Sequence, residues 1–508
     1  KLKDEPINRF GQNQFEMYSL PVVKPKIIVG IIGRNGIGKS TALEILSGNI
    51  VPNLGNFKEE TKDYSKIIGK YSTKNLGEYF KRLQEKNVRV SYKPQRVELI
   101  SSMYKGHKVI ELLKKADERN KLFPVMKDLE LEDIKERNIA ELSGGELQRL
   151  AIAACLLKSA DVYYFDEPTS FLDITHRIKA AKVIKRLSED NSVVVVEHDL
   201  TTLDYISDEI QIVYGEPACY GIFSQSKAVR RGINEYMDGY LPDENIRFRD
   251  YSIKFFDRPQ ESVLSRSVLV EFPVLEKHFE SFKLKVNEIK LHKEEVLTIM
   301  GSNGLGKSTF LKMLAGELSP SNTVIKGLKI SYKPQYLESD IKGNVEDYLR
   351  SFAGAEFGSG WYKTNILEKL NINNILGNEI KNLSGGELQK MHIACCLSRQ
   401  DVELIAMDEP SAFIDVEDRL KVAEVIKDFV IRRNICAVVV DHDIQFIDYL
   451  SDSMLVFEGI PGKEGHVSEP LSKRDGMNRV LKNLDITYRR DKISGRPRIN
   501  KPGSQLDQ

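Results

Sequence analysis

The chain has 508 residues, and its 41% of hydrophobic residues is typical of a globular protein long enough to bury more than one core. Its 75 basic and 74 acidic side chains leave a net charge of +1, so attraction to nucleic acid or to an anionic membrane must come from local patches. No run of 18 apolar residues and no basic-then-apolar leader occurs, which argues against a membrane span or a secretory signal and makes the cytoplasm the expected location.

In chain order, the first informative element is a short apolar strand at residues 27–32 that ends in the glycine-rich turn GRNGIGKST. The residues after the lysine read as a helix. A strand, loop and helix of this kind places backbone amides around a phosphate, a lysine on the outer phosphates and a hydroxyl on magnesium. The predicted phosphate-binding residues are Gly33, Asn35, Gly36, Gly38, Lys39, Ser40 and Thr41.

Residues 61–89 follow as a basic segment, with eight basic side chains against three acidic ones and with interleaved tyrosines. Basic and aromatic side chains together suit phosphate contacts and base stacking in RNA. The same pattern equally fits a solvated helix whose buried face is Leu76, Tyr79, Phe80 and Leu83. Both interpretations stay open. The basic residues are Lys62, Lys66, Lys70, Lys74, Lys81, Arg82, Lys86 and Arg89.

Two further apolar strands, at residues 163–165 and 193–196, are each followed by polar residues of catalytic type. Asp166 closes the first strand and is expected to orient magnesium, while Glu167 can polarise an attacking water. Taken alone, an acid pair at a strand end could be a helix cap. His198 follows the second strand.

The LSGGELQ sequence, which precedes the acid pair, predicts a helix that begins at a serine and two glycines. Its apolar positions follow helical spacing. Such a helix start exposes amide donors and the positive end of the helix dipole, which suit a γ-phosphate, although a simple helix cap is the alternative. The predicted contacts are Ser143, Gly145 and Glu146.

All of these motifs recur in the same order in the second half of the chain. The glycine-rich turn recurs 268 residues later and the other motifs 240 to 244 residues later, so the first half carries 28 extra residues between its first two motifs. Alternating strands and helices with short apolar strands predict an α/β fold with a buried parallel sheet in each half. The repeated residues are Gly301, Asn303, Gly304, Gly306, Lys307, Ser308, Thr309, Gln335 (matching Gln95), Ser384, Gly386, Glu387, Asp408, Glu409 and His442.

Together these motifs resemble the Walker A, glutamine-loop, LSGGE, Walker B, aspartate-loop and histidine-loop set of the ABC ATPases, present twice. The resemblance implies two tandem P-loop ABC-type nucleotide-binding domains arranged head-to-tail, with each ATP between the Walker A of one half and the LSGGE of the other. It implies Mg²⁺ near Ser40, Gln95 and Asp166, and near Ser308, Gln335 and Asp408. One site would join Lys39, Ser40, Gln95, Asp166, Glu167 and His198 to Ser384, Gly386 and Glu387, and the other would join Lys307, Ser308, Gln335, Asp408, Glu409 and His442 to Ser143, Gly145 and Glu146.

In this family an aromatic ring ahead of Walker A usually stacks on adenine. By position, Phe10 or Phe15 is the candidate in the first half and Phe272 in the second. Single aromatic residues are also common in protein cores, so a core role is the alternative at each position.

The segments outside the repeat, YGEPACYG, GINEYMDGYLPDENIRFR, FEGIPG and the basic carboxyl-terminal stretch, resemble the RNase L inhibitor family, ABC subfamily E. The implied organisation is a first nucleotide-binding domain at 1–215 with a helix-loop-helix insertion at about 61–89, a hinge at 216–265, a second nucleotide-binding domain at 266–458, and a second hinge with a basic segment at 459–508. The ten basic residues between Lys473 and Lys501 suggest an RNA-facing surface, with a solvated tail as the alternative.

This family resemblance implies ribosome recycling, in which ATP-driven closure of the two domains splits ribosomes after termination or rescue. The implied partners are the ribosome, its small subunit (rRNA and proteins), a class-1 release factor or its rescue paralogue, and translation initiation factors, with no membrane. Two other classes stay open, namely another soluble ABC translation factor and an ATP-binding scaffold or inhibitor without turnover. Intact Glu167 and Glu409 argue against the scaffold.

Several features depart from the family pattern. The family carries two iron–sulfur clusters on an amino-terminal domain, and no ligands for them are expected here, because the five cysteines have no metal-site spacing and are expected to be reduced, mostly buried thiols. In the second half Lys390, Ile414 and Asp441 replace the usual arginine, leucine and glutamate. Each keeps charge or bulk, so tuning rather than loss is expected, although lysine cannot reproduce a bidentate arginine contact.

Overall fold

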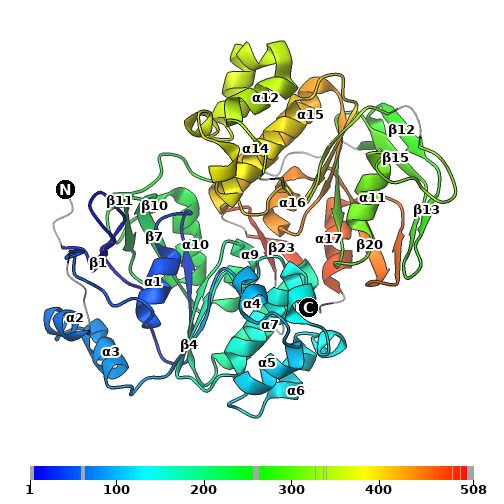
Figure 1. Cartoon of the computed structure of the whole chain (residues 1–508). Helices are drawn as coiled ribbons and strands as arrows, with labels where there is room; N and C mark the ends of the chain where they lie inside the picture. The colour runs from blue at the N-terminus through cyan, green and yellow to red at the C-terminus, as the bar shows by residue number, and fades with distance from the viewer. Residues whose placement is uncertain are drawn as a thin grey trace. The chain divides into compact units, whose positions relative to one another are not determined.

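The structure is a computed structural model with two compact units, Lys1–Lys254 and Phe255–Gln508, each of which is described by itself (Figure 1). It describes residues 5–58, 63–255, 263–325, 328–335, 337–338, 340–482, 484, 486–491 and 494–499. Of the basic residues predicted to face RNA, Lys62, Lys492 and Lys501 lie outside the described residues.

The first unit is built on one nine-stranded sheet with a parallel centre. β3 pairs in parallel with β6 and β7, and β5 pairs in parallel with β4 and β6. The predicted apolar strands are confirmed as β3, β5 and β6. In order across the sheet the strands are β1 (Asn8–Arg9), β2 (Glu16–Met17), β8 (Tyr220–Phe223), β7 (Glu209–Glu216), β3 (Ile28–Ile32), β6 (Ser192–Val196), β5 (Val162–Asp166) and β4 (Val90–Lys93), with β9 (Lys227–Ala228) on β7.

The second unit repeats this sheet strand for strand, which confirms the tandem α/β fold predicted from the repeated motifs. A two-stranded sheet of β12 (Val268–Phe272) and β15 (Ile289–His292) is added to it. The main sheet has the order β13 (Leu275–His278), β14 (Lys283–Val286), β21 (Glu464–Val467), β20 (Ser453–Ile460), β16 (Val296–Met300), β19 (Cys436–Val440), β18 (Leu404–Asp408) and β17 (Ile330–Lys333), with β22 (Leu471–Ser472) on β20.

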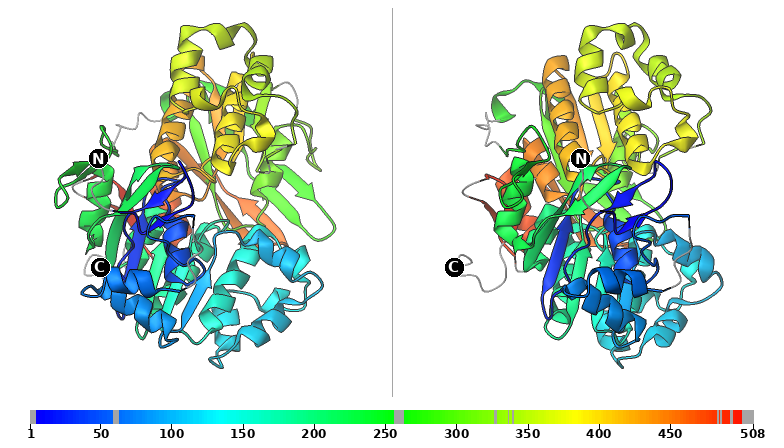
Figure 2. Two further views of the ribbon diagram at one scale, coloured as in Figure 1. Left: turned by 60° about the vertical axis from the view of Figure 1, so that its left-hand side comes forward. Right: turned by 90° about the vertical axis from the view of Figure 1, so that its left-hand side faces the viewer.

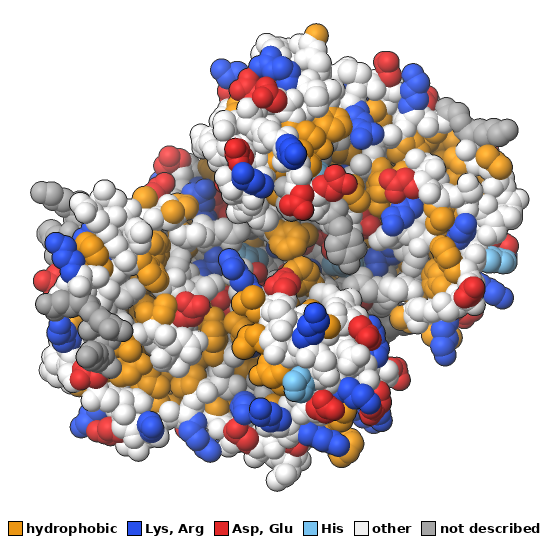
Figure 3. Space-filling view, in the orientation of Figure 1, with side chains coloured by type: hydrophobic (Ala, Val, Ile, Leu, Met, Phe, Trp, Pro, Cys, Tyr) orange, Lys and Arg blue, Asp and Glu red, His pale blue; other side chains and the backbone are white. Residues whose placement is uncertain are grey.

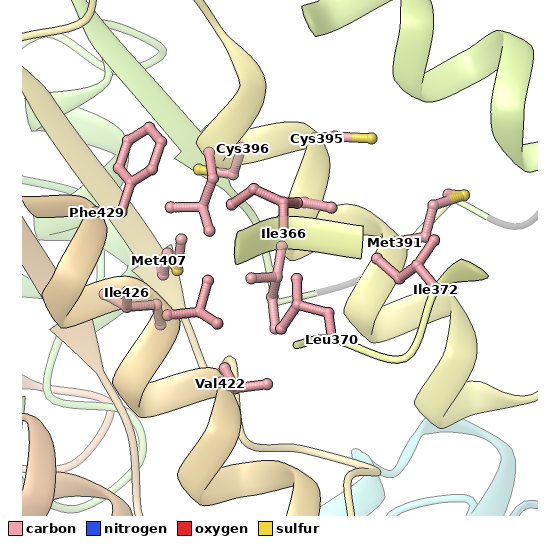
Figure 4. Packing of buried hydrophobic residues seen from close by; sticks show 14 of the residues in the cluster. Ile366, Leu370, Ile372, Met391, Cys395, Cys396, Met407, Val422, Ile426 and Phe429 are labelled. Atoms are coloured by element: carbon pink, nitrogen blue, oxygen red, sulfur yellow. The ribbon is translucent and has the colours of Figure 1, made fainter. Parts of the chain in front are cut away.

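The central strands are buried along their whole length because helices cover the sheet. In the second unit, side chains from α14, α15, β18 and a π-helical turn converge in one apolar cluster (Figure 4). Four of the five cysteines are buried free thiols, as predicted, and Cys219 is exposed. The helices of the first unit include α1 (Lys39–Leu46), α4 (Glu98–Met103), α5 (Val109–Ala116), α6 (Leu122–Asp128), α7 (Gly144–Leu157), α8 (Ile174–Leu187) and α9 (Leu200–Ile206). Those of the second include α11 (Lys307–Leu314), α12 (Val345–Ala353), α13 (Gly360–Tyr362), the π-helical turn (Lys363–Glu368), α14 (Gly385–Ser398), α15 (Val416–Arg433) and α16 (Ile444–Leu450).

The segments that the sequence left outside the repeat also repeat in structure, which corrects their interpretation as non-repeating pieces. Each contributes two strands to its sheet, then a helix, α10 (Val229–Asp238) or α17 (Lys473–Lys482), then a hairpin, β10 (Tyr240–Leu241) with β11 (Ile246–Arg247) or β23 (Tyr488–Arg490) with β24 (Pro497–Ile499). Sequence comparison missed this because what repeats is the order of elements, while few residues are shared. The predicted limits of the hinges stay predictions.

The extra residues of the first unit form the two helices expected of an insertion, α2 (Ser65–Lys70) and α3 (Asn75–Gln84), at its periphery (Figures 1 and 2). Phe80 is fully buried, Leu76 and Leu83 pack on the core, and the Tyr79 hydroxyl bonds to Leu46 O and Tyr164. Phe80 and Tyr79 are therefore core residues, as the solvated-helix interpretation predicts, and not platforms for bases.

Among the described helices, none combines the length and the apolar composition that crossing a membrane requires.

Candidate functional site

The carboxyl ends of the parallel strands bring the repeated motifs of each unit to one edge of its sheet. β3 leads through the glycine-rich turn into α1, while Asp166 ends β5 and His198 follows β6. β16, β18 and β19 place the second copies in the same way. Residues far apart in the chain, such as Lys39 and His198 or Lys307 and His442, therefore meet at one edge.

Both phosphate loops have the backbone that the glycines predict. Gly36 and Gly38 have φ of 76° and 88°, and Gly304 and Gly306 have 78° and 91°, a region where side chains are disfavoured. The Lys39 ammonium donates to Gly33 O and Arg34 O at 2.9 and 2.6 Å. A phosphate would replace these carbonyls as the partner of the lysine.

The Lys307 ammonium in the second unit makes the same bonds, to Gly301 O and Ser302 O at 2.8 and 2.7 Å, and a further one to Asn303 Oδ1 at 3.2 Å. Both lysines are buried at the start of their helices. The two loops are thus alike in geometry and are ready to bind a phosphate chain.

The aromatic residues predicted to stack on adenine differ in their exposure and in their distance from the phosphate loop. Phe15 lies against the first phosphate loop, since a Cβ on Gly38 would be 2.4 Å from its ring. Phe10 is 47% exposed on the same hairpin. The sequence expectation for Phe272 is wrong in placement, because this residue at the end of β12 is only 5% exposed and packs in the core of the second unit.

The residue that sequence reasoning missed is Phe282. Its ring lies 3.0 Å from where a Cβ on Gly306 would be, which is the position that Phe15 holds in the first unit. Phe279, 43% exposed, packs beside it. The signal was available, because both phenylalanines lie on the hairpin of β13 and β14 that corresponds to the hairpin of Phe10 and Phe15. Phe272 precedes them on β12, which pairs with β15 in a separate two-stranded sheet.

Asp166 and Asp408 are buried carboxylates whose oxygens have no hydrogen-bond partner of normal geometry among the described residues. Burial, with repulsion from Glu167, raises the pKa of Asp166 to about 6, although the nearby Ser40 hydroxyl partly offsets this. Burial likewise raises the pKa of Asp408, which lies near Ser308.

Buried carboxylate oxygens beside a hydroxyl are the donor set that Mg²⁺ takes together with phosphate oxygens and water. Ser40 with Asp166, and Ser308 with Asp408, therefore fit a Mg²⁺ ion brought in by a nucleotide.

The glutamates after these aspartates each contact a glutamine and a histidine. Gln95 Nε2 donates to Glu167 Oε1 at 2.8 Å, and Gln335 Nε2 donates to Glu409 Oε1 at 2.9 Å. The sequence assigned both glutamines to magnesium, and here they hold the glutamates.

The histidines distinguish the two units. The His198 Nε2 to Glu167 Oε1 distance is 3.0 Å, whereas the His442 Nε2 to Glu409 Oε1 distance is 3.6 Å. Burial would raise the pKa of Glu167, but His198 and Lys39 favour the ionised form and lower it to about 2. Burial and repulsion from Asp408 and Asp441 instead raise the pKa of Glu409 to about 7. The two carboxylates are equivalent in position and differ in charge environment.

The unusual Asp441 keeps the bonds that Glu197 makes in the first unit. Glu197 accepts from His198 N at 2.8 Å and from the Thr169 hydroxyl at 2.7 Å, and Asp441 accepts from His442 N at 2.7 Å and from the Ser411 hydroxyl at 2.7 Å. The shorter carboxylate thus still orients its histidine.

The contacts of Lys390 differ more from those of its first-unit counterpart, Arg149, than the contacts of Asp441 differ from those of Glu197. Arg149 donates to the carbonyls of Leu129 and Glu130, whereas Lys390 pairs with Asp418 at 2.8 Å. A single ion pair therefore replaces a forked contact to two carbonyls, and the positive charge stays partnered.

Both LSGGE sequences begin helices, as predicted. Ser143 and Glu146 form a reciprocal capping box at the start of α7, and Ser384 and Glu387 form the same box at α14. A side chain at Gly145 or Gly386 would crowd the neighbouring backbone, because a Cβ there would lie 3.0 Å from Phe171 O or 2.8 Å from Phe413 O. The serine and the glutamate therefore cap the helix, and the same helix start still presents the glycine backbone that a γ-phosphate contact would use.

The basic segments behave differently from one another. On α2, α3 and their flanks, the seven basic residues that are described are all exposed, although Lys70 pairs with Glu5. Of the eight described basic residues between 473 and 498, only Arg474 and Lys482 are exposed. Over the faces in view, basic and acidic side chains are interspersed (Figure 3).

The carboxyl-terminal basic residues serve the fold, which corrects their interpretation as an RNA-facing surface. Arg490 pairs with Asp448 at 2.7 Å, Arg498 pairs with Asp491 at 3.3 Å, and Arg496 is fully buried. The basic count alone could not show this, because it does not say which arginines pair with carboxylates in the fold, such as Asp448 on α16.

Comparison with known proteins follows the same division into two units. Residues 21–170 and 284–412 match the ABC transporter family. An uncharacterized ABC transporter ATP-binding protein of Methanocaldococcus jannaschii is 48% identical over 99% of this chain and 83% of its own. The translation initiation factor RLI1 of Saccharomyces cerevisiae is 41% identical over 98% of this chain and 83% of its own.

Two solved structures are similar over almost the whole chain. The complex of the archaeal ribosome recycling factor aABCE1 with ribosomal stalk protein aP1 gives a TM-score of 0.94 at 49% identity, covering 100% of this chain and 97% of that one. The structure of ribosome-bound archaeal Pelota and ABCE1 gives 0.93 at 47% identity, covering 100% of this chain and 85% of that one.

Proposed function

Because the chain belongs to the ABC transporter family of ATPases and, within it, to the RNase L inhibitor family, we propose that it is a ribosome recycling factor driven by ATP hydrolysis. Relatives named as translation and recycling factors, similar over nearly all of this chain, support the proposal. A protein that acts on ribosomes is expected in the cytoplasm.

The observation that carries the proposal is the complete set of hydrolytic groups in both units. Glu167 and Glu409 are each held by a glutamine and lie within 3.6 Å of a histidine, beside a phosphate loop of the same geometry. A nucleotide-binding scaffold without turnover needs no carboxylate at this place. Two intact sets therefore favour a motor over a scaffold.

We propose the following roles within each unit. Lys39 and Lys307 bind the outer phosphates, Ser40 with Asp166 and Ser308 with Asp408 hold Mg²⁺, and Phe15 and Phe282 stack on adenine. When bound, Mg²⁺ would neutralise charge on the phosphate oxygens. Glu167 and Glu409 accept the proton of the attacking water. That each ATP is completed by the LSGGE helix of the other unit stays a prediction from the family resemblance.

For partners, we propose the small ribosomal subunit, with the exposed basic residues of α2 and α3 as the contact to rRNA. The ribosome-bound complex with Pelota and the complex with a stalk protein support a ribosomal partner in related proteins. A class-1 release factor or its rescue paralogue as the trigger, and initiation factors as later partners, complete the proposal.

The test is gradient sedimentation of Glu167→Gln, Glu409→Gln and the double variant with ribosomes and Mg–ATP at physiological salt. We expect the double variant to turn over ATP slowly and to remain on the small subunit. Glu189→Gln, at an exposed residue just after α8 and outside the basic surface of α2 and α3, is the matched control and should behave as the wild type. If neither the wild type nor the variants migrate with ribosomal particles, recycling is refuted while the ATPase assignment stands.

A further inference from the structure

Both catalytic-site glutamates have a backbone conformation that glutamate rarely adopts. Glu167 has φ of 46° and Glu409 has φ of 47°, in the left-handed region that disfavours a residue with a side chain. Each follows the last residue of its strand, so the chain turns sharply out of the sheet there. Such a conformation persists only where neighbouring groups hold it in place.

One holding group is a buried lysine at the end of the neighbouring strand. Lys93 is the last residue of β4, is 1% exposed, and donates to Asp166 O at 2.8 Å and to Glu167 O at 3.2 Å. Lys333 ends β17, is 2% exposed, and donates to Asp408 O at 2.7 Å. A buried lysine is costly and rare unless its charge is used.

The other holding group comes from the LSGGELQ helix. Gln148 of α7 is fully buried and donates from Nε2 to Glu167 O at 2.6 Å. Gln389 of α14 is 1% exposed and donates to Glu409 O at 2.6 Å. The lysine and the glutamine thus approach the same short stretch of backbone from two different elements in both units.

We propose that Lys93 with Gln148, and Lys333 with Gln389, are positioning residues for ATP hydrolysis, because they fix the left-handed backbone that aims Glu167 and Glu409 at the attacking water. The lysines also place a positive charge among buried acids. Asp166, Glu167 and Glu197 face Lys93, and Asp408, Glu409 and Asp441 face Lys333. No contact to nucleotide is required of them. Lys93 and Lys333 lie two residues before Gln95 and Gln335, so each can be identified in the sequence as the lysine of YKPQ.

The inference rests on the proposed roles of Glu167 and Glu409, and the Glu→Gln variants test those roles separately. If those variants hydrolyse ATP normally, the assignment of the glutamates fails first. If they are inactive, the experiment below tests positioning alone.

The experiment uses two double variants of the full chain. One combines Lys93→Met with Lys333→Met in the same chain, and the other combines Gln148→Met with Gln389→Met. Steady-state ATP turnover gives kcat and KM, and titration with a non-hydrolysable Mg–ATP analogue gives Kd. Loss of the buried hydrogen bonding to the backbone of the Asp–Glu pair should lower kcat by roughly 10- to 100-fold and leave Kd within about twofold. The glutamine variants change no charge, so they keep the test valid if the lysine variants do not fold.

Ser91→Ala with Ser331→Ala is the matched control. Each serine is buried on the same strand as its lysine, but its hydroxyl bonds to Cys155 O or Cys396 O instead of the acid pair. The control should keep kcat while losing a buried hydrogen bond of similar kind. Folded glutamine variants with unchanged kcat, or a Kd that rises in proportion to the fall in kcat, would overturn the proposal.

Discussion

Phe272 and Phe282 give the sharpest test of the nucleotide site, because sequence position favours one and the structure favours the other. Phe272 is 5% exposed in the core of the second unit. Replacing a buried phenylalanine by alanine costs about 3–5 kcal/mol of unfolding free energy. For a unit of this size that lowers Tm by roughly 6–20 °C. Nucleotide affinity at a temperature where the variant is folded should not change.

Phe282→Ala should instead weaken nucleotide binding while changing Tm little. Its ring is half-buried beside the phosphate loop, where it can stack on a base. Stacking of a base on an aromatic ring contributes about 1–3 kcal/mol, so the Kd for a fluorescent ATP analogue should rise roughly 5- to 150-fold.

The assay pairs calorimetric unfolding with fluorescence titration for both variants, and Phe15→Ala serves as the first-unit counterpart of Phe282→Ala. The assignment of Phe272 to the core is contradicted if Phe272→Ala weakens binding at unchanged Tm. The assignment of Phe282 to adenine stacking is contradicted if Phe282→Ala lowers Tm and leaves Kd unchanged.

Three further predictions follow from single residues. Asp166→Asn should raise the unfolding free energy by about 1–3 kcal/mol without nucleotide, because burial and repulsion from Glu167 destabilise the charged carboxylate that the amide replaces, and should abolish hydrolysis at the first unit; a lower Tm would contradict this. Gly38→Ala should abolish ATP binding at the first unit and leave the second unit's phosphate loop able to bind, since its Cβ would lie 2.4 Å from Phe15 at a φ of 88°, whereas Gly358→Ala, with no atom within 4 Å, should leave binding at both units unchanged. His176 contacts Asp173 and Glu130, which raise its pKa against the opposing effect of burial, so its stabilising contribution should be present below about pH 6.5 and be lost as pH rises through the higher folded pKa. Unfolding free energies of the wild type and His176→Gln between pH 5 and 9 check this, and equal pH dependence of the two would contradict it.

The repeated α/β fold, the phosphate loops and the acid pairs could all be predicted from the sequence. These depend on local patterns, in which an apolar strand, a glycine-rich turn and a helix follow one another within a few residues. The helices that begin at Ser143 and Ser384 were equally readable, because capping is a local interaction.

Features that depend on residues far apart in the chain could not be predicted from the sequence and are visible only in the folded protein. Arg490 and Arg496 look like RNA-binding residues until Asp448 and the surrounding core are in place. Phe272 looks like a base platform until β12 pairs with β15 and buries it. Glu167 and Glu409 occupy equivalent positions in the sequence, yet their distances to His198 and His442 give them different charge environments. Burial and pairing are properties of the assembled core, so composition and spacing can name the groups but cannot say which of them remain available to a ligand.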